Sequence, residues 1–304
     1  LALSPEAPQK IADFEILDLD PIHPGPKHWT EHLSPDLFLL HEKEWPMSHD
    51  QIGDVIIVKV PEPLLNHQEE IGKAMLQQHS NARVVCADNG VKGEFRVRDL
   101  TIISHDNSAT TRTKVKESGS QFWVDPGQAY YSPRLANERI GTVDCAKKLS
   151  FKLGRKISVC DPYAGVGPAL MPLSGLEDSI EEIFASDLNP KAAELLTLNL
   201  PNYWTACRDA RQLANELPEC CDLLLVNLPH DSISHLPDLL GLLKKGHEVV
   251  IRGWAILALD SLERAESNIR DILSECEILS LTIEANRSYS PNDTYACIEA
   301  HIIR

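Results

Sequence analysis

Short apolar runs alternate with mixed polar and apolar segments from residue 157 to the C-terminus. The apolar runs are bounded by turn residues and are predicted to be strands, at 158–161, 182–187, 206–209, 221–229 and 248–252. The other segments predict helices, at 135–150, 189–199, 236–243 and 261–276. This alternation predicts a parallel sheet, which two further runs at 278–283 and 295–303 are expected to close as an antiparallel pair.

The pattern upstream of about residue 125 is different and predicts a small α+β domain. Its expected elements are strands at 52–60, 81–87, 95–103, 111–116 and 120–124 and a helix at 68–79. Asp88-Asn-Gly90 has turn chemistry, and the alternation of 95–103 places Arg96 and Arg98 on one face. Residues 1–50 show little pattern beyond a proline-rich linker. We therefore expect an N-terminal extension at 1–50, a small domain at 51–117 and a larger domain at 118–304.

A glycine-containing stretch follows the first strand of the larger domain. The strand ends at Asp161, and Gly165-Val166-Gly167 forms an expected tight turn, with Pro168 at the first position of a helix. Glycine permits positive φ and a close approach of backbone to a ligand. A helix N-terminus offers free N–H groups to an anionic group. The stretch predicts a nucleotide-like cofactor at the carboxyl end of a parallel strand, although a turn that only packs a helix on the sheet remains a possible interpretation.

The glycines and acidic residues of this stretch distinguish a dinucleotide from other nucleotide-like cofactors. A dinucleotide fingerprint requires a third glycine, which Pro168-Ala-Leu170 does not provide. Asp161 precedes the glycines instead, and the next strand ends in Asp187, as expected for a partner of ribose hydroxyls. This arrangement resembles the S-adenosylmethionine site of class I methyltransferases. We therefore expect S-adenosylmethionine as the cofactor.

Composition and charge limit the classes of function. Hydrophobic residues make up 43% of the 304 positions and charged residues 24%, as in ordinary globular proteins. No apolar run has the length needed to span a bilayer. The net charge of −16 argues against broad phosphate binding, so a nucleic-acid function would depend on specific residues. The 8 cysteines form no C-x-x-C pair, so we expect no metal, reduced buried thiols and a cytoplasmic location.

Six segments together resemble the archaeal and eukaryotic type of tRNA (guanine-N1) methyltransferase. They are Gly53-Asp54, Gly93-Glu-Phe-Arg-Val-Arg98, Tyr131-Ser-Pro-Arg-Leu-Ala-Asn-Glu-Arg139, Asp161-Pro-Tyr-Ala-Gly-Val-Gly-Pro168, Asp187-Leu-Asn-Pro190 and Asn227-Leu-Pro229. The resemblance implies an α/β fold, Rossmann-like as in class I methyltransferases, with a doubly wound mixed sheet after the small α+β domain. It also implies transfer of a methyl group from S-adenosylmethionine to N1 of guanosine 37 in tRNA. We expect tRNA as the partner, no membrane association and a monomer. The tRNA-elbow domain that this family usually carries is not evident in residues 1–50.

The resemblance also implies roles for individual residues. Glu138, the glutamate of the motif S-P-R-L-x-x-E-R, would remove the N1 proton of guanine. Arg98 would stabilise the negative charge that develops on guanine O6, and Asn227 and Pro229 would border the target base. Spacing alone favours a simpler interpretation, in which Arg134 and Glu138 form a surface ion pair of little consequence.

The cofactor would be held at the strand ends. The resemblance implies that Asp187 binds the ribose hydroxyls, that Asp209 lies at the adenine side, and that the backbone of 164–168 binds the methionine portion. The full set of residues assigned to the cofactor is Arg134, Asp161, Tyr163, Ala164, Gly165, Val166, Gly167, Pro168, Asp187, Leu188, Asn189, Asp209, Ala210 and Asn227.

Two alternatives remain open at this stage. A sister family transfers an aminocarboxypropyl group from S-adenosylmethionine in wybutosine synthesis, but it usually lacks the Pro-Arg-Leu and Asn-Leu-Pro runs that are present here. The second alternative is a non-catalytic relative that binds S-adenosylmethionine or RNA. The presence of Glu138 and Arg98 argues against this second alternative.

Overall fold

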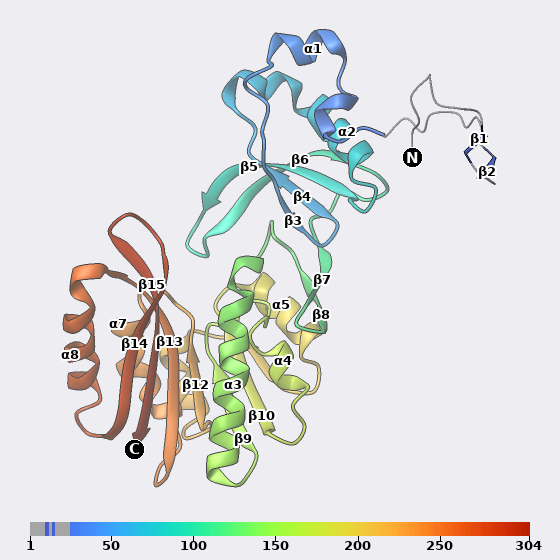
Figure 1. The fold of residues 1–304 in the computed structure, drawn as a ribbon. Coiled ribbons are helices and arrows are strands. Elements are labelled where there is room, and N and C mark those ends of the chain that lie inside the picture. Colours follow the sequence, from blue (N-terminus) through green and yellow to red (C-terminus); the bar gives the residue numbers. More distant parts are fainter. Residues whose placement is uncertain (1–9, 12–13, 16–24) are drawn as a thin grey trace.

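The computed structural model describes residues 10–11, 14–15 and 25–304 (Figure 1). The two dipeptides pair as β1 (Lys10–Ile11) and β2 (Phe14–Glu15). The remainder of the expected extension up to residue 24 lies outside the described residues. Within the described ranges, no helix has the length and apolar character needed to cross a membrane.

In the described part of the chain, the largest sheet has seven strands in the order β11-β10-β9-β12-β13-β15-β14. The strands are β9 (Ile157–Asp161), β10 (Ile180–Asp187), β11 (Trp204–Cys207), β12 (Leu223–Val226), β13 (Glu248–Ala258), β14 (Glu277–Ser288) and β15 (Asp293–Ile303). β9 to β13 are parallel, and β15 is antiparallel to both β13 and β14. The expected mixed sheet is confirmed. Its strand order reverses between β9 and β12, where doubly wound sheets bind ligands.

Helices cover both faces of this sheet (Figure 1). One face carries α3 (Ala136–Leu153), α4 (Met171–Ser174) and α5 (Pro190–Asn199). The other carries α6 (Leu213–Glu216), α7 (Ser232–Leu239) and α8 (Leu262–Ile272), with the 3₁₀ turns η4 (Ala210–Gln212), η5 (Leu240–Leu242) and η6 (Leu259–Ser261). Each face has its own apolar core, which includes Leu149 and Leu196 on the first face and Leu239 and Ile269 on the second. The doubly wound α/β fold therefore agrees with the sequence prediction.

The small domain is built on a four-stranded sheet in the order β3-β4-β5-β6. Its elements are η1 (Trp29–His32), α1 (Pro35–Leu40), β3 (Asp50–Ile52), β4 (Val55–Val58), η2 (Glu62–His67), α2 (Gln68–Gln78), β5 (Val84–Lys92) and β6 (Val97–His105). Trp29 and Trp45 are 2% and 5% exposed and pack in one cluster with Ile71 and Met75 of α2. The part of the expected extension after residue 25 therefore contributes to the core of the small domain, while the domain boundaries themselves stay a prediction.

A hairpin of β7 (Thr113–Glu117) and β8 (Ser120–Val124) links the two sheets. Its residues Phe122 and Val124 share an apolar cluster with Val55 of the small domain and with Val166 of the glycine turn. The amide of Asn199, at the end of α5, accepts from Trp123 N at 2.8 Å and donates to Trp123 O at 2.9 Å and to Val166 O at 2.8 Å. The hairpin is thus bonded directly to the helix that supports the predicted cofactor site.

Three predictions about strand ends and turns differ from the structure. The run 52–60 is not one strand, because Gly53 turns the chain with φ +58° between β3 and β4. Asp88-Asn-Gly90 lies within β5 and appears there as a register shift against β6. The predicted strand at 206–209 ends two residues earlier, and Asp209 instead caps η4 by accepting from Arg211 N. Each error arose because glycine occurs both in turns and in irregular strands, and because an acidic residue can either end a strand or cap a helical turn.

Candidate active site

The predicted cofactor turn follows β9 at its carboxyl end. Gly165 and Gly167 have φ values of +58° and +87°, in the left-handed region that favours glycine. A Cβ at Gly167 would lie 2.9 Å from Leu196 Cδ1, so α5 leaves little room for a larger residue. The carbonyl oxygen of Tyr130 would lie 3.8 Å from a Cβ at Gly165. The segment that leads into α3 is therefore next to this turn.

The regular helix predicted to begin at Pro168 begins later. The N–H groups of Leu170 and Met171 both donate to Gly167 O at 3.0 Å, and α4 starts at Met171 and is only 4 residues long. Pro172 has no N–H to donate to the carbonyl of Pro168, which interrupts the run of helical hydrogen bonds. The prediction of a helix N-terminus at Pro168 was wrong, so the predicted cofactor site would depend on the turn itself.

Two carboxylates organise the backbone of this turn. Asp161 is 1% exposed and its Oδ1 accepts from Tyr163 N at 3.1 Å. Asp187, at the end of β10, accepts from Gly165 N through Oδ2 and from Asn189 N through Oδ1, both at 2.8 Å. Burial raises the pKa of Asp187 despite these two bonds. For Asp161, burial and then the nearby charge of Asp187 raise the pKa to about 7, although the Tyr163 N–H opposes this shift.

We expect Asp161→Asn to remove a pH dependence of folding stability. A carboxyl group whose pKa is raised by folding stabilises the fold at acidic pH, and this contribution is lost as the pH rises towards about 7. The free energy of unfolding of the wild type should therefore fall by roughly 1–3 kcal/mol relative to Asp161→Asn between about pH 5 and pH 8. Urea unfolding at both pH values measures this difference. Parallel pH profiles would mean that Asp161 is already ionised in the folded protein at pH 5.

The adenine side of the predicted site contains a contact that the sequence did not suggest. The hydroxyl of Tyr163 lies 2.8 Å from Nδ1 of His235, which comes from α7. The Asp209 carboxylate accepts hydrogen bonds from Arg211 N, Nε and Nη2 at 3.0, 3.1 and 2.7 Å, and the bond from the Arg211 guanidinium lowers the pKa of Asp209. Tyr163 and Asp209 were both predicted site residues, but His235 had no recognisable signal because it lies 72 positions from Tyr163.

Other predicted cofactor residues also take part in hydrogen bonds and packing of the fold. The Asn189 side chain caps α5 by accepting from Lys191 N at 3.0 Å, and its Nδ2 donates to Gln128 O at 2.8 Å. Ala210 is 4% exposed in the first position of η4, whereas Leu188 is 45% exposed directly after β10. Leu188 is thus the exposed apolar group next to Asp187, and Asn189 fixes the strand-to-helix turn.

Glu138 lies in the first turn of α3, where Asn286 of β14 holds its carboxylate. Asn286 Nδ2 donates to Glu138 Oε2 at 2.6 Å, which leaves Oε1 for another donor. Arg134 does not pair with Glu138, because it lies before α3 in the 3₁₀ turn η3 (Pro133–Leu135) and donates from Nη2 to Asp50 at 2.7 Å. The simpler interpretation of an Arg134–Glu138 surface pair was wrong, and Asn286 is a site residue that the sequence analysis missed.

Arg98 is bound by two carboxylates of the small domain. Its Nη2 donates to Asp50 Oδ2 at 2.7 Å and its Nη1 to Asp88 Oδ2 at 3.2 Å. Asp50 therefore bridges Arg98 and Arg134, one from each domain. Burial opposes the charge of Asp50, but the hydrogen bonds from the two guanidinium groups outweigh it and lower the pKa. The structure thus brings Arg98 together with Arg134 rather than with Glu138, through an aspartate that the sequence analysis passed over.

Side-chain and backbone contacts join the remaining motifs to this region. Leu135 of η3 is buried in a cluster with Trp254 of β13 and Tyr295 of β15. Ile256 N, also on β13, donates to Pro229 O at 2.8 Å. Asn227 follows the last residue of β12 and is half-buried. The motif 131–139, the glycine turn and the 227–229 turn therefore meet at the carboxyl edge of the sheet, around the switch between β9 and β12.

A family model described as the TRM5/TYW2 methyltransferase domain matches residues 113–279, more than half of the 304 residues. The chain belongs to the TRM5/TYW2 methyltransferase family. A second family model, the TYW2 N-terminal domain, matches residues 30–104. Both the expected family and the expected Rossmann-like fold are thereby confirmed.

Relatives within the family come from archaea and eukaryotes. The tRNA (guanine(37)-N(1))-methyltransferase Trm5b of Pyrococcus abyssi is 32% identical over 200 residues, which cover 62% of this chain and 56% of that protein. The Trm5b of Methanocaldococcus jannaschii is 34% identical over 155 residues, which cover 51% of this chain and 42% of that protein. The chain thus spans about half the length of the curated relatives it matches.

Solved structures of the family have the same architecture. The crystal structure of Trm5b from Pyrococcus abyssi has a TM-score of 0.71 at 26% identity and covers 97% of this chain and 87% of that one. TYW2 from Pyrococcus horikoshii has a TM-score of 0.68 at 17% identity and covers 88% of this chain and 98% of that one. At this lower identity the likeness concerns the fold alone.

In this TRM5/TYW2 family member, a cavity of about 750 Å³ opens beside the 227–229 turn. It lies between α7, α8 and the end of β13. Its polar lining includes the hydroxyls of Ser232, Ser234, Ser261 and Ser267, together with Arg264, Asn268 and Asp271. The sequence analysis did not single out any of these residues, because they come from three separate elements.

The family motif 131–139 is anchored to the β7–β8 hairpin by Arg139, which is 6% exposed. Arg139 Nη1 bonds both oxygens of Glu117 at 2.7 and 2.6 Å, its Nη2 donates to Ser132 O at 2.9 Å, and Tyr131 OH donates to Glu117 at 2.9 Å. The Arg139–Glu117 pair therefore fixes the chain before the η3 turn, through Tyr131 and Ser132, and the first turn of α3 after it.

We expect Arg139→Ala to destabilise the protein strongly, by about 3–5 kcal/mol, because it leaves the Glu117 carboxylate buried without its cation. Urea unfolding measures the effect. The double variant Glu117→Ala/Arg139→Ala should lose less than Arg139→Ala alone, since no unpaired charge stays buried. If the double variant were less stable than the single one, packing rather than charge would be the contribution of Arg139.

Proposed function

We propose that this protein transfers the methyl group of S-adenosylmethionine to N1 of guanosine at position 37 of tRNA. The observation that carries the proposal is the placement of the motif 131–139, the glycine turn and the 227–229 turn at one edge of the sheet, in a member of the TRM5/TYW2 family. Relatives that are 32% and 34% identical bear the name tRNA (guanine(37)-N(1))-methyltransferase. The enzyme activity, the cofactor and the tRNA partner all form part of this proposal.

The residues of the turn suit S-adenosylmethionine. Each carboxylate oxygen of Asp187 accepts one backbone N–H and keeps a further lone pair for a ribose hydroxyl. The left-handed glycines would allow the methionine portion to approach the backbone of this turn closely. Bound S-adenosylmethionine would supply a methyl group activated by its sulfonium.

Glu138 would act as the general base for guanine N1. A base is needed because N1 carries a proton at neutral pH, and a positioned carboxylate contributes about 10²–10⁴-fold to such a transfer. Asn286 holds Oε2 of Glu138 and leaves Oε1 to take the proton. Asn227 and Pro229, in the turn that follows β12, would border the base.

Arg98 would stabilise the charge that develops on guanine O6. Two of its five N–H groups donate to Asp50 and Asp88, so the guanidinium retains further donors. We expect Arg98→Ala to lower kcat by about 10²-fold, in the range found when one such donor is removed. Steady-state kinetics with tRNA decide the role. A change confined to KM would make Arg98 a phosphate contact instead.

A second candidate function is aminocarboxypropyl transfer, which the match of residues 30–104 to the TYW2 N-terminal domain favours. Both functions use S-adenosylmethionine but transfer different carbons of it. The cytoplasmic location and the monomeric state remain predictions from the sequence.

One assay separates the candidates. The full chain is incubated with an unmodified tRNA transcript carrying guanosine 37 and with S-adenosylmethionine labelled in the methyl group or, in parallel, in the aminocarboxypropyl portion. Methyl label recovered as N1-methylguanosine supports the proposal, and a transcript with adenosine at position 37 is the control. Recovery in tRNA of label from the aminocarboxypropyl portion would instead support the second candidate function. No transfer by a protein that still binds S-adenosylmethionine would exclude both.

A further inference from the structure

Three cysteine thiols meet one residue away from the cofactor turn. Cys160 is on β9 directly before Asp161, and Cys220 and Cys221 precede β12, the neighbouring strand. Their three sulfur atoms lie within 4.8 Å of one another. Cys160 and Cys221 are fully buried, whereas Cys220 is half-buried and gives access from the surface. Cys220 lies outside regular strand structure, so neighbouring thiols need not point to opposite faces.

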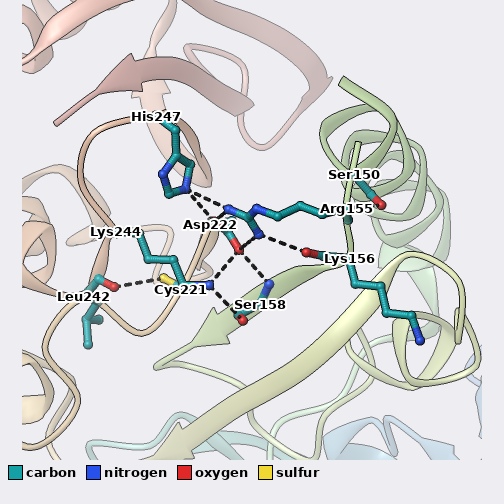
Figure 2. Close-up of polar contacts among 9 residues, drawn as sticks. All are labelled: Ser150, Arg155, Lys156, Ser158, Cys221, Asp222, Leu242, Lys244 and His247. Carbon is teal, nitrogen blue, oxygen red and sulfur yellow. Dashed lines mark hydrogen bonds and ion pairs between the residues drawn. The ribbon is translucent and has the colours of Figure 1, made fainter. Parts of the chain in front are cut away.

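Oxygen ligands next to these thiols are already occupied. Asp222 Oδ1 accepts from Arg155 at 2.7 Å and lies 2.8 Å from His247 Nε2. Its Oδ2 accepts from Arg155 at 3.1 Å, from Ser158 N at 2.8 Å and from Lys244 at 3.0 Å. Figure 2 shows these contacts around Asp222, and it also shows the Cys221 thiol donating a hydrogen bond to Leu242 O. The sulfur atoms therefore remain as the donors available to a cation.

The donor set favours a soft metal ion. The cluster offers three sulfur donors, and Cys220 is the one with access from the surface. Sulfur ligands are those that soft cations prefer.

We propose that Cys160, Cys220 and Cys221 form a binding site for one thiophilic d¹⁰ cation, of the class that includes Zn²⁺ and Cu⁺. Three metal–sulfur bonds of about 2.3 Å place the sulfurs roughly 4 Å apart, so only a small contraction of the cluster is needed. Binding forms three metal–sulfur bonds and releases the thiol protons of the cluster to solvent. Within the described residues, no histidine or carboxylate joins the cluster, which leaves water as any fourth ligand. The proposal does not depend on the transfer reaction.

The test is a titration of the full, reduced, metal-free protein with Cd²⁺, whose bonds to thiolate give ultraviolet charge-transfer absorption. We expect saturation at one Cd²⁺ per chain, and competition by Zn²⁺ or Cu⁺ identifies the preferred ion. Cys220→Ser should weaken Cd²⁺ binding by at least about 100-fold, because even outer groups of metal sites contribute 10–100-fold. Cys207→Ser is the matched control and should change nothing, since Cys207 is an exposed cysteine outside the cluster.

Three results would contradict the proposed metal site. They are absence of charge-transfer absorption, absorption that persists in Cys220→Ser, and formation of a Cys160–Cys220 disulfide under mild oxidation that Cd²⁺ does not prevent. If Cys220→Ser fails to fold, alkylation of the wild type decides instead. Cd²⁺ should then protect Cys220 but not Cys207 from iodoacetamide, and equal labelling of the two would refute the proposal.

Discussion

Replacing Glu138 by glutamine should lower the rate of methyl transfer by about 10²–10⁴-fold, the contribution of a positioned general base. Glutamine has nearly the same shape and can still accept from Asn286 Nδ2, but it cannot take the N1 proton of guanine. Single-turnover transfer to a guanosine-37 transcript measures this step. The affinity for S-adenosylmethionine should stay close to that of the wild type, because Glu138 belongs to the base side of the site.

Asp144→Asn is the matched control for this experiment. Asp144 is an exposed carboxylate on the same helix, α3, and has no assigned part in the reaction. Asn286→Ala should give an intermediate loss, since it frees the carboxylate without removing it. A wild-type rate for Glu138→Gln would remove Glu138 from the mechanism, and the N1 proton would then require another acceptor.

Asp187→Ala is expected to raise the dissociation constant for S-adenosylmethionine by about 100-fold or more. The variant removes the predicted partner of the ribose hydroxyls and also the acceptor of Gly165 N and Asn189 N, and hydrogen bonds to a charged group contribute about 1.5–3 kcal/mol each. Isothermal titration calorimetry with S-adenosylmethionine measures the change without any RNA.

The control for Asp187 is Asp178→Asn, an exposed carboxylate that precedes the same strand, β10. Asp187→Asn should have an intermediate effect on affinity, because its single amide oxygen can replace only one of the two acceptors. It should bind S-adenosylmethionine better than Asp187→Ala and less well than the wild type. Unchanged affinity in all variants would mean that Asp187 only orders the turn.

Features that depend on neighbouring residues were predictable from the sequence. The alternation of apolar runs with helical segments gave the mixed doubly wound sheet, and Asn189-Pro190 correctly marked the start of α5. The glycines of the cofactor turn do have positive φ. Predictions failed locally where one residue type has two uses, as for Pro168, since the regular helix begins three residues later, at Met171.

Tertiary structure alone decided which side chains act together. Asn286 reaches Glu138 from 148 positions away, Asp50 joins Arg98 and Arg134 across 48 and 84 positions, and His235 meets Tyr163 across 72. The thiol cluster likewise combines Cys160 with two cysteines that precede the neighbouring strand β12. The rule that seeks paired cysteines within one short segment could not find it.

The physical reason for this difference is the distance along the chain over which each kind of interaction acts. Strand and helix periods, caps and positive-φ turns result from steric contacts and hydrogen bonds within a few residues. The sequence by itself therefore determined most of the elements, their order and the position of the glycine turn. The partners, charges and pKa values of the site depend on burial and on groups brought together by the packed sheets. These contacts have no sequence period, and only the folded chain defines them.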